Sequence, residues 1–235
     1  SVYLMYDHNF NSKWQIVGGV RVEDYKQETD TFSLATAEPI ASVIDEQSVL
    51  PSLGVNWRFA DTQQLRLALS KTVARPDFKE TANSQFFENE FNVIIRGNPL
   101  LEISEVANLD LRWEWYFGDN DRDQLSVAGF LKEMEDPIER VVQPASGTAG
   151  NSRTFRNALD GEVYGVEVEA RKEFLLGSGG STAIFVDFNA AYIESDVTLE
   201  NGETSLLQGA PEYTANIVAG YDNFATGHQV TLLYN

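Results

Sequence analysis

Cysteine is absent from the 235-residue chain, which excludes a disulfide framework and any metal site built on thiolates. Cations are also scarce, since 17 lysines and arginines stand against 36 aspartates and glutamates, for a formal net charge of -19. Because proteins bind the phosphate backbone through clustered lysine and arginine, we exclude nucleic acid as a partner. The two histidines, His8 and His228, lie near opposite ends of the sequence, so we expect no metal site formed by them.

Long apolar runs are missing as well. A membrane-spanning helix needs roughly 18 consecutive apolar residues, and the sequence has no such run. The first ten residues lack the charged, apolar and small-residue zones of a signal peptide. These absences exclude a helical membrane protein. They leave open a membrane-spanning β-barrel, because barrel strands alternate apolar with polar residues and keep the average hydropathy modest.

Motifs for catalysis and cofactor binding are not found. The glycine-rich stretch 177–181 joins two expected strands and opens no helix, so it does not fit a phosphate-binding loop. Asp119, Asp121 and Asp123 have the alternate spacing of a calcium loop, yet the required glycine and distal glutamate do not follow. Glu167 and Glu169 fit solvated side chains better than a catalytic pair. We therefore expect neither an enzyme nor a bound cofactor.

Apolar residues instead recur at every second position, in runs about ten residues long, which is typical of β-strands. In the segment 108–117 one parity is apolar and the other mostly charged. An apolar parity at every second residue also recurs in 65–70, 162–174, 182–194 and 213–221. The apolar parity of 108–117 consists of Leu109, Leu111, Trp113, Trp115 and Phe117. A helix would scatter these residues around its axis, so the pattern predicts strands with one apolar face.

Connections of two lengths alternate along the chain. Short polar turns are expected at 9–13, 60–63, 118–123, 176–181 and 224–227. Long irregular segments are expected at 28–48, 76–104, 135–152 and 195–209. An antiparallel sheet would then have short turns at one end and long loops at the other. Transmembrane barrels show this asymmetry, with short periplasmic turns and longer extracellular loops.

Aromatic residues gather beside the short turns, as in an interfacial belt on the periplasmic side. They are Trp14, Trp57, Phe59, Trp115, Phe117, Phe174, Tyr221 and Phe224. Lys71 fits less well, because it continues the apolar parity of Leu65, Leu67 and Leu69. Either its ammonium lies above the hydrocarbon, or a bulge shifts the parity of the strand.

A soluble β-sandwich is the alternative, because its inward faces also alternate. Sandwich strands are usually about five or six residues long, and their long loops are rarely confined to alternate connections. The sequence therefore favours an all-β fold, an antiparallel transmembrane β-barrel with long extracellular loops and short periplasmic turns. It supplies about ten strands of a larger barrel.

Three stretches carry a family resemblance: 65–80, 96–117, and 129–142 followed by 157–174. Each stretch combines an expected strand with an interruption of the strand pattern, and the order and spacing of the three stretches are characteristic. The signature residues are Arg75, Pro76, Gly97, Asn98, Pro99, Tyr164, Gly165 and Glu167. Together the stretches resemble the C-terminal barrel portion of TonB-dependent outer-membrane receptors, most of all the branch found in relatives of Xanthomonas and Caulobacter.

The resemblance implies a wall of about 22 strands around an N-terminal plug, in the outer membrane of a Gram-negative bacterium. Residues 1–235 would form part of that wall, with the plug, its TonB box and the terminal strands lying outside this sequence. The implied function is TonB-dependent active uptake of a scarce nutrient, either an oligosaccharide or a metal-siderophore complex, with a lean toward carbohydrate. The implied partners are outer-membrane lipid, lipopolysaccharide, TonB through the missing N-terminal region, and a small-molecule or oligosaccharide ligand.

Ligand recognition is expected in the long loops. Aromatic rings interleaved with amides and charged groups can stack on a sugar and hydrogen-bond to it. The predicted contact residues are Phe86, Phe87, Phe91, Glu88, Asn89 and Arg96. The alternative is that these residues only pack the loop. Two rival functions also remain, namely a passive porin or adhesin barrel and a soluble β-sandwich binding module.

Overall fold

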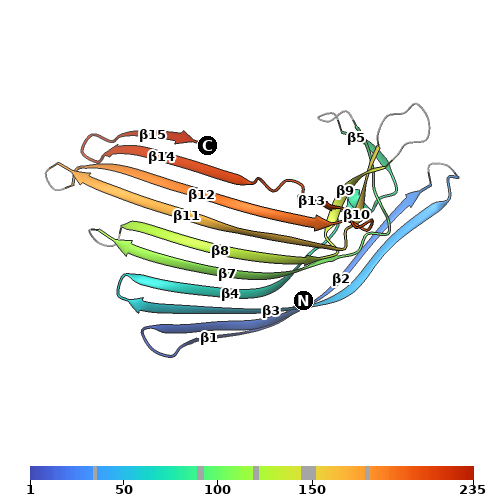
Figure 1. Ribbon diagram of the computed structural model, residues 1–235, viewed down its shortest axis with the longest axis horizontal. Helices are drawn as coiled ribbons and strands as arrows, with labels where there is room; N and C mark the ends of the chain where they lie inside the picture. The colour runs from blue at the N-terminus through green and yellow to red at the C-terminus, as the bar shows by residue number, and fades with distance from the viewer. Residues whose placement is uncertain (34–35, 89–92, 119–121, 144–151, 178–179) are drawn as a thin grey trace.

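The computed structural model describes residues 1–33, 36–88, 93–118, 122–143, 152–177 and 180–235. Its strands form two sheets, a large curved one and a small one folded against one end of it (Figure 1). The one helix of these residues, α1 (Phe78–Thr81), has four residues, and no helix among them is long and apolar enough to cross a membrane.

The main sheet is antiparallel throughout, and its neighbours follow the chain order. Its strands, from edge to edge, are β1 (Val2–Asn9), β2 (Trp14–Phe32), β3 (Pro39–Ala60), β4 (Gln63–Ala74), β7 (Ser104–Phe117), β8 (Asp123–Glu135), β11 (Asp160–Leu176), β12 (Thr182–Thr198), β14 (Tyr213–Asn223) and β15 (His228–Tyr234), with β13 (Thr204–Ser205) beside β12. The predicted all-β architecture is therefore confirmed. The sheet is an arc of a barrel wall and does not close on itself.

The five expected short turns all join neighbouring strands at one end of the main sheet, which lies at the left in Figure 1. Gly118 at the β7–β8 turn and Gly227 at the β14–β15 turn have φ of 80° and 74°, a backbone region that suits glycine. The expected aromatic cluster lies at this end. The rings of Trp14 and Trp57 stack with centroids 5.2 Å apart.

Pairing of strands in register gives the main sheet two chemically different faces. On one face Leu67 pairs with Leu111, and on the other Arg66 pairs with Arg112. We call the first the apolar face; it includes Leu67, Leu109, Leu111, Trp113, Val127, Val168, Ile184, Val186 and Ile217. We call the second the polar face; it includes Gln64, Arg66, Arg112, Glu114, Ser126, Glu167, Glu169, Asn189 and Asn216.

The soluble β-sandwich alternative is wrong. Within the described residues no second sheet covers the apolar face, and Leu111 and Ile217 remain 46% and 43% exposed on it. A sandwich would bury these side chains between two sheets.

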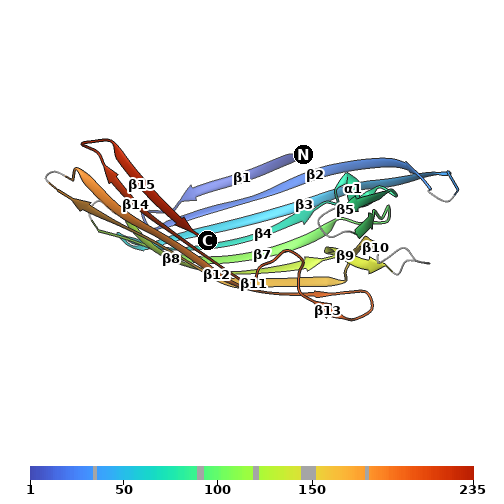
Figure 2. The ribbon, with the colours of Figure 1, turned by 90° about the horizontal axis from the view of Figure 1, so that it is seen from above.

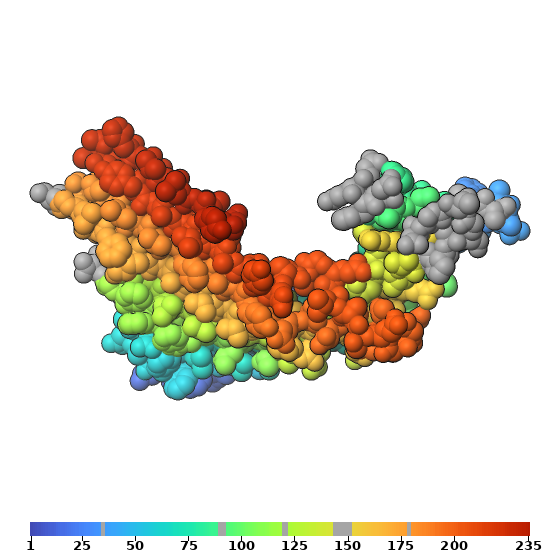
Figure 3. All heavy atoms as spheres, turned by 45° about the horizontal axis from the view of Figure 1, so that its top comes forward, coloured from blue at the N-terminus to red at the C-terminus, as the bar shows by residue number. Residues whose placement is uncertain are grey.

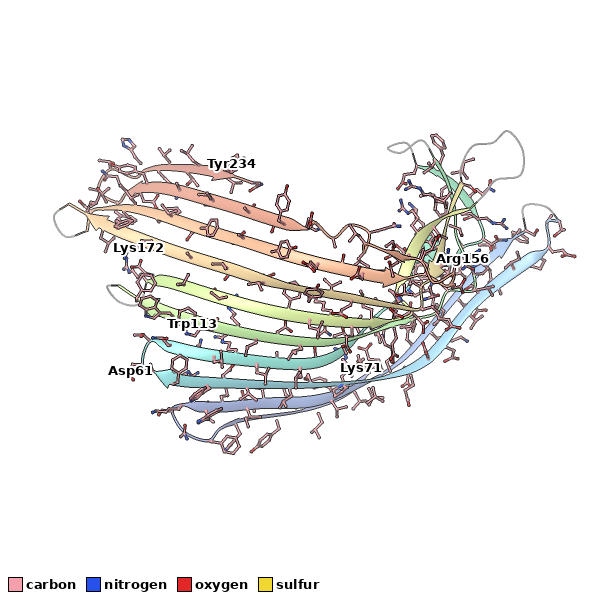
Figure 4. All side chains as sticks on the ribbon, in the orientation of Figure 1. Asp61, Lys71, Trp113, Arg156, Lys172 and Tyr234 are labelled. Carbon is pink, nitrogen blue, oxygen red and sulfur yellow. The ribbon has the colours of Figure 1, made fainter. Side chains whose placement is uncertain are left out.

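Lys71 keeps its place on the apolar face. The β4–β7 register runs without a shift through the pair Lys71 and Ala107, so the bulge alternative is wrong for this strand. The Lys71 ammonium lies 2.5 Å from a carboxylate oxygen of Glu105, on the half of β4 nearer the small sheet (Figure 4).

The long segments hold more regular structure than expected. Residues 28–48 mostly continue β2 and β3 as a paired ribbon out to Phe32 and Pro39. Other long segments build the small sheet, in the order β5 (Gln85–Glu88), β6 (Val93–Arg96), β10 (Ser152–Asn157) and β9 (Ile138–Gln143). Strands of four to six residues are too short to show a clear period of two, so the sequence pattern did not reveal them.

The main sheet is curved along its width (Figure 2). In the space-filling view a deep hollow lies between β14–β15 on one side and the small sheet on the other (Figure 3). The small sheet rests on the polar face, since polar-face residues of β2 and β3 bond the chain segment that carries it.

Candidate functional site

Two hydrogen bonds between distant segments hold the small sheet in place. The buried amide of Gln27 on β2 donates to the hydroxyl of Thr81 at 3.1 Å. The hydroxyl of Ser42 on β3 donates to the Pro99 carbonyl at 2.8 Å. Buried polar groups that are paired in this way fix orientation, because leaving either partner unpaired costs free energy. The end of the polar face away from the short turns is therefore partly covered by a fixed structure.

The signature pair Arg75 and Pro76 lies where β4 gives way to this covering segment. The Arg75 guanidinium is 2.5 Å from the Glu23 carboxylate and 4.5 Å from the centroid of the Tyr25 ring. Proline cannot continue the strand ladder, and Asp77 then caps α1 in a reciprocal capping box with Glu80. These contacts direct the chain from the wall onto the polar face.

The signature run from Gly97 to Pro99 fastens the same segment. The Asn98 amide N–H donates to the Glu80 carbonyl at 2.6 Å, and its side-chain amide donates to the Phe155 carbonyl at 3.0 Å. A Cβ on Gly97 would lie 2.1 Å from the Ala82 carbonyl oxygen, so only glycine fits this approach.

The predicted contact residues divide between the two faces of the small sheet. Phe86 packs against the core of that sheet, which consists of Ile95, Leu101 and Phe155. Phe87 is exposed on the opposite face, which also carries Arg96. Glu88 pairs with Arg140 at 3.0 Å, and Arg96 donates two hydrogen bonds to the Asn83 side chain at 3.0 and 2.7 Å. Asn89 and Phe91 lie outside the described residues.

Two cavities flank the small sheet where it approaches the β12–β13 connection. Cavity A measures about 640 Å³ and cavity B about 740 Å³, both within the usual range of ligand pockets, about 300 to 1,000 Å³. The residues that line both cavities are Thr154, Arg156, Asn157 and Glu200. Cavity A also borders Arg96 and the run from Gly97 to Pro99, and cavity B also borders Glu139 and Arg140. The signature run and one predicted contact residue thus line a cavity.

Arg156 lies on the small sheet at the border of the two cavities (Figure 4). Its side chain is 54% exposed, and its guanidinium lies 3.4 Å from the carboxylate of Glu200, whose side chain is 64% exposed. Such an exposed pair contributes little to stability, so both charged groups are available to a ligand.

Glu139 is the register partner of Arg156 on β9, and it is only 4% exposed. Burial raises the pKa of its carboxyl above the ordinary value of 4.5, and the backbone N–H of Gln208 partly opposes this shift. Buried titratable groups beside a cavity are frequent in functional sites.

The remaining signature residues belong to β11. The Tyr164 hydroxyl on the apolar face bonds Glu194. Gly165 lies under the Phe130 ring, since a Cβ there would come within 2.7 Å of it. Glu167 pairs across the ladder with Ala128 on the polar face. None of the three lines cavity A or B.

A charged network also lines the polar face near the short turns, remote from the cavities. The buried Glu114 carboxylate accepts from the Tyr116 hydroxyl at 3.1 Å and lies 3.0 Å from Arg112 and 3.3 Å from Arg66. Arg112 also pairs with Glu169, which accepts from Ser126. These contacts link β4, β7, β8 and β11 across the polar face.

The sequence reasoning missed Glu139, Arg140 and Arg156. A signal existed in the charge distribution, because residues 138–157 carry three arginines and one glutamate within a strongly acidic chain. A local reversal of charge of this kind marks a segment with its own binding preference.

The comparisons with known proteins agree on the fold. A family model described as "TonB dependent receptor-like, beta-barrel" matches residues 1–234. A search of curated proteins gave no match. Solved structures with similar folds include the haemophore receptor HasR of Serratia marcescens in complex with haemophore and haem (TM-score 0.66, 14% identity, 98% of this chain and 44% of that chain). The siderophore receptor PiuA of Acinetobacter baumannii (0.65, 14%, 98% and 35%) and the copper transporter OprC (0.61, 17%, 91% and 30%) are similar as well.

The chain spans less than half the length of each of these structures. At such identities the likeness shows the fold alone, and the narrower resemblance to a Xanthomonas and Caulobacter branch stays a prediction. The family model, however, covers nearly the entire sequence. The chain therefore belongs to the β-barrel family of TonB-dependent receptors.

Proposed function

We propose that this chain is part of the wall of an outer-membrane receptor that imports a scarce nutrient with energy delivered through TonB. The proposal rests on two features found together. The main sheet is a wall with an apolar and a polar face, and the small sheet, which lies over one end of the polar face, borders two cavities. A wall alone would suit a passive pore. A folded structure with ligand-sized cavities over the polar face suits a receptor that captures its substrate.

The apolar face supports membrane insertion. At roughly 3.3 Å per residue and a tilt near 40°, the stretch from Tyr164 to Phe174 climbs about 25 Å, the height of the apolar band of such barrels. The ladder places both rings on the apolar face, near its two ends. Beyond Tyr164, the pair of Lys71 and Glu105 lies at the level we assign to lipopolysaccharide headgroups.

The ligand is an oligosaccharide or a metal chelate. The solved relatives include a haemophore receptor in complex with its haemophore and haem, a siderophore receptor and a copper transporter. In this chain, Phe87 and Arg96 remain candidate contacts, because they lie on the same face of the small sheet, the face opposite its apolar core. Contact with TonB is assigned to a part of the receptor that lies outside residues 1–235.

Uptake in living cells tests the proposal. The gene that encodes this chain is deleted, and growth is measured on single oligosaccharides and under iron limitation. We expect the deletion to abolish growth at low concentrations of one nutrient, and deletion of tonB to have the same effect on that nutrient. A passive porin or adhesin would keep its phenotype without TonB, and uptake that persists in the tonB strain would refute active transport.

A further inference from the structure

Cavities A and B share four lining residues among those that the structure describes, so a ligand in one lies next to the other. The shared residues include a guanidinium donor on Arg156, a carboxylate acceptor on Glu200 and a hydroxyl on Thr154. Because the pair of Arg156 and Glu200 is exposed and only 3.4 Å apart, it offers a donor fork and an acceptor side by side at the border of the cavities.

The charges around the cavities nearly cancel, although the chain is strongly acidic. Cavity B borders two arginines, Arg140 and Arg156, against Glu200, Glu203 and the buried Glu139. Cavity A borders Arg96 and Arg156 against Glu102, Asp136 and Glu200. A polyanionic chelate would need an excess of cations, and a bare metal ion would not tolerate the guanidinium groups. The balance favours an uncharged ligand.

Amides and hydroxyls complete the lining. Asn157 and Thr154 border both cavities, Asn83 and Asn98 border cavity A, and Gln208 borders cavity B. The remaining lining is partly apolar, through residues such as Ile40 and Leu159. Mixed donors and acceptors around a partly apolar cavity suit a ligand that presents many hydroxyls, each of which both donates and accepts.

Glu139 adds a buried carboxyl that carries no ion pair among the described residues, although Arg156 is its ladder partner. Burying a charged carboxylate is unfavourable, and this burial raises the pKa of Glu139, so its carboxyl is more readily protonated than that of an exposed glutamate. A protonated carboxyl donates one hydrogen bond and accepts others, as a sugar hydroxyl requires.

We propose that cavities A and B form one site for a neutral, hydroxyl-rich ligand, an oligosaccharide, held by Arg156 and Glu200 at their border and by Glu139 within cavity B. The assignment rests on the proposed receptor function and narrows its substrate class. It differs from the predicted contact set: among the members that the structure describes, only Arg96 lines either cavity.

Binding by the purified full-length receptor in detergent tests the site. The probes are a printed array of uncharged glucan, xylan, galactan and chitin oligosaccharides, and ferric citrate as an anionic chelate. We expect at least one neutral oligosaccharide to bind, with its affinity measured by calorimetry. Arg156→Gln should weaken that affinity about tenfold, the loss of one charged hydrogen bond, and Glu200→Gln should weaken it less because an acceptor is kept.

Arg122→Gln is the matched control. Arg122 is 51% exposed and pairs with Glu173 at 2.7 Å, beside a short turn at the other end of the sheet. Its substitution should leave the affinity within about twofold, and heat-modifiable migration on gels should show that all variants are folded.

The outcomes separate the two proposals. The assignment of cavities A and B to a neutral oligosaccharide would be wrong if only ferric citrate binds, if no oligosaccharide binds, or if the sugar affinity is the same in Arg156→Gln and the wild type. If the receptor binds a sugar through Arg156 but uptake does not need TonB, the transport proposal fails and the site stands. If uptake needs TonB but the ligand is anionic, the site fails and the transport proposal stands.

Discussion

Gly97 shows at the scale of one residue how the small sheet depends on close backbone contact. Carbonyl oxygens of Ala82, Lys79 and Glu80 lie 2.1, 2.6 and 2.9 Å from the position a Cβ would occupy. These are backbone atoms fixed by α1 and its cap, so they cannot move aside cheaply.

Gly97→Ala should therefore destabilise the small sheet locally, by about 3 kcal/mol. Hydrogen exchange of the full-length receptor would show faster exchange in β5 and β6 with no change in β7. Gly129→Ala is the control, since the nearest atom to its Cβ lies 3.8 Å away. Equal exchange in the two variants would contradict the tight approach at Gly97.

The buried Glu139 predicts a pH dependence of the same small sheet, which lies outside the wall segments proposed to span the membrane. Because burial raises the pKa of this carboxyl above 4.5, its contribution to stability is fully present below about pH 4.5 and is lost as pH rises through the raised value. The charged groups around cavity B are Arg140, Arg156, Glu200 and Glu203.

Exchange in β9 should therefore accelerate as pH rises above the pKa of Glu139, after correction for the intrinsic pH dependence of exchange. Glu139→Gln should remove this trend, because the amide does not titrate. A trend that survives in Glu139→Gln would assign it to another group.

At the scale of the element, β7 carries the two environments of the wall on alternate residues. Leu111 lies near the middle of the apolar stretch and pairs with Leu67. The preceding residue, Asp110, pairs with Ala68 on the polar face. A one-residue change of register would exchange the faces. Substitutions at these two adjacent positions therefore test directly which face meets hydrocarbon.

Leu111→Lys should lower the free energy of unfolding in lipid vesicles by about 2 to 4 kcal/mol, because a lysine near the bilayer centre destabilises the folded barrel by this amount. Asp110→Lys adds the same side chain to the polar face and should change it far less. Urea titration of the refolded receptor measures both. Equal effects would show that the apolar face does not meet hydrocarbon.

At the scale of the whole molecule, β1 and β15 each pair on one side only among the described residues. Unpaired edges and a large exposed apolar face promote association. The 235-residue chain made alone should therefore aggregate in plain buffer and stay dispersed only in detergent. Size-exclusion chromatography with light scattering tests this, and a monodisperse monomer without detergent would contradict the assignment of the two faces.

The sequence by itself determined the wall. Alternation in segments such as 108–117 fixed which side chains share a face, and glycine, asparagine and aspartate marked the five short turns, because both signals are local along the chain. The five strand pairs that these turns join followed, since short turns join antiparallel neighbours.

Only the tertiary structure decided the small sheet and its cavities. There β6 and β10 pair in parallel from segments far apart in the chain, and the bonds from Gln27 to Thr81 and from Ser42 to Pro99 span 54 and 57 positions. Strands this short have no readable period, and no local rule places Arg156 beside Glu200. Their meeting depends on packing the whole segment against the polar face, a long-range arrangement that only the folded chain specifies.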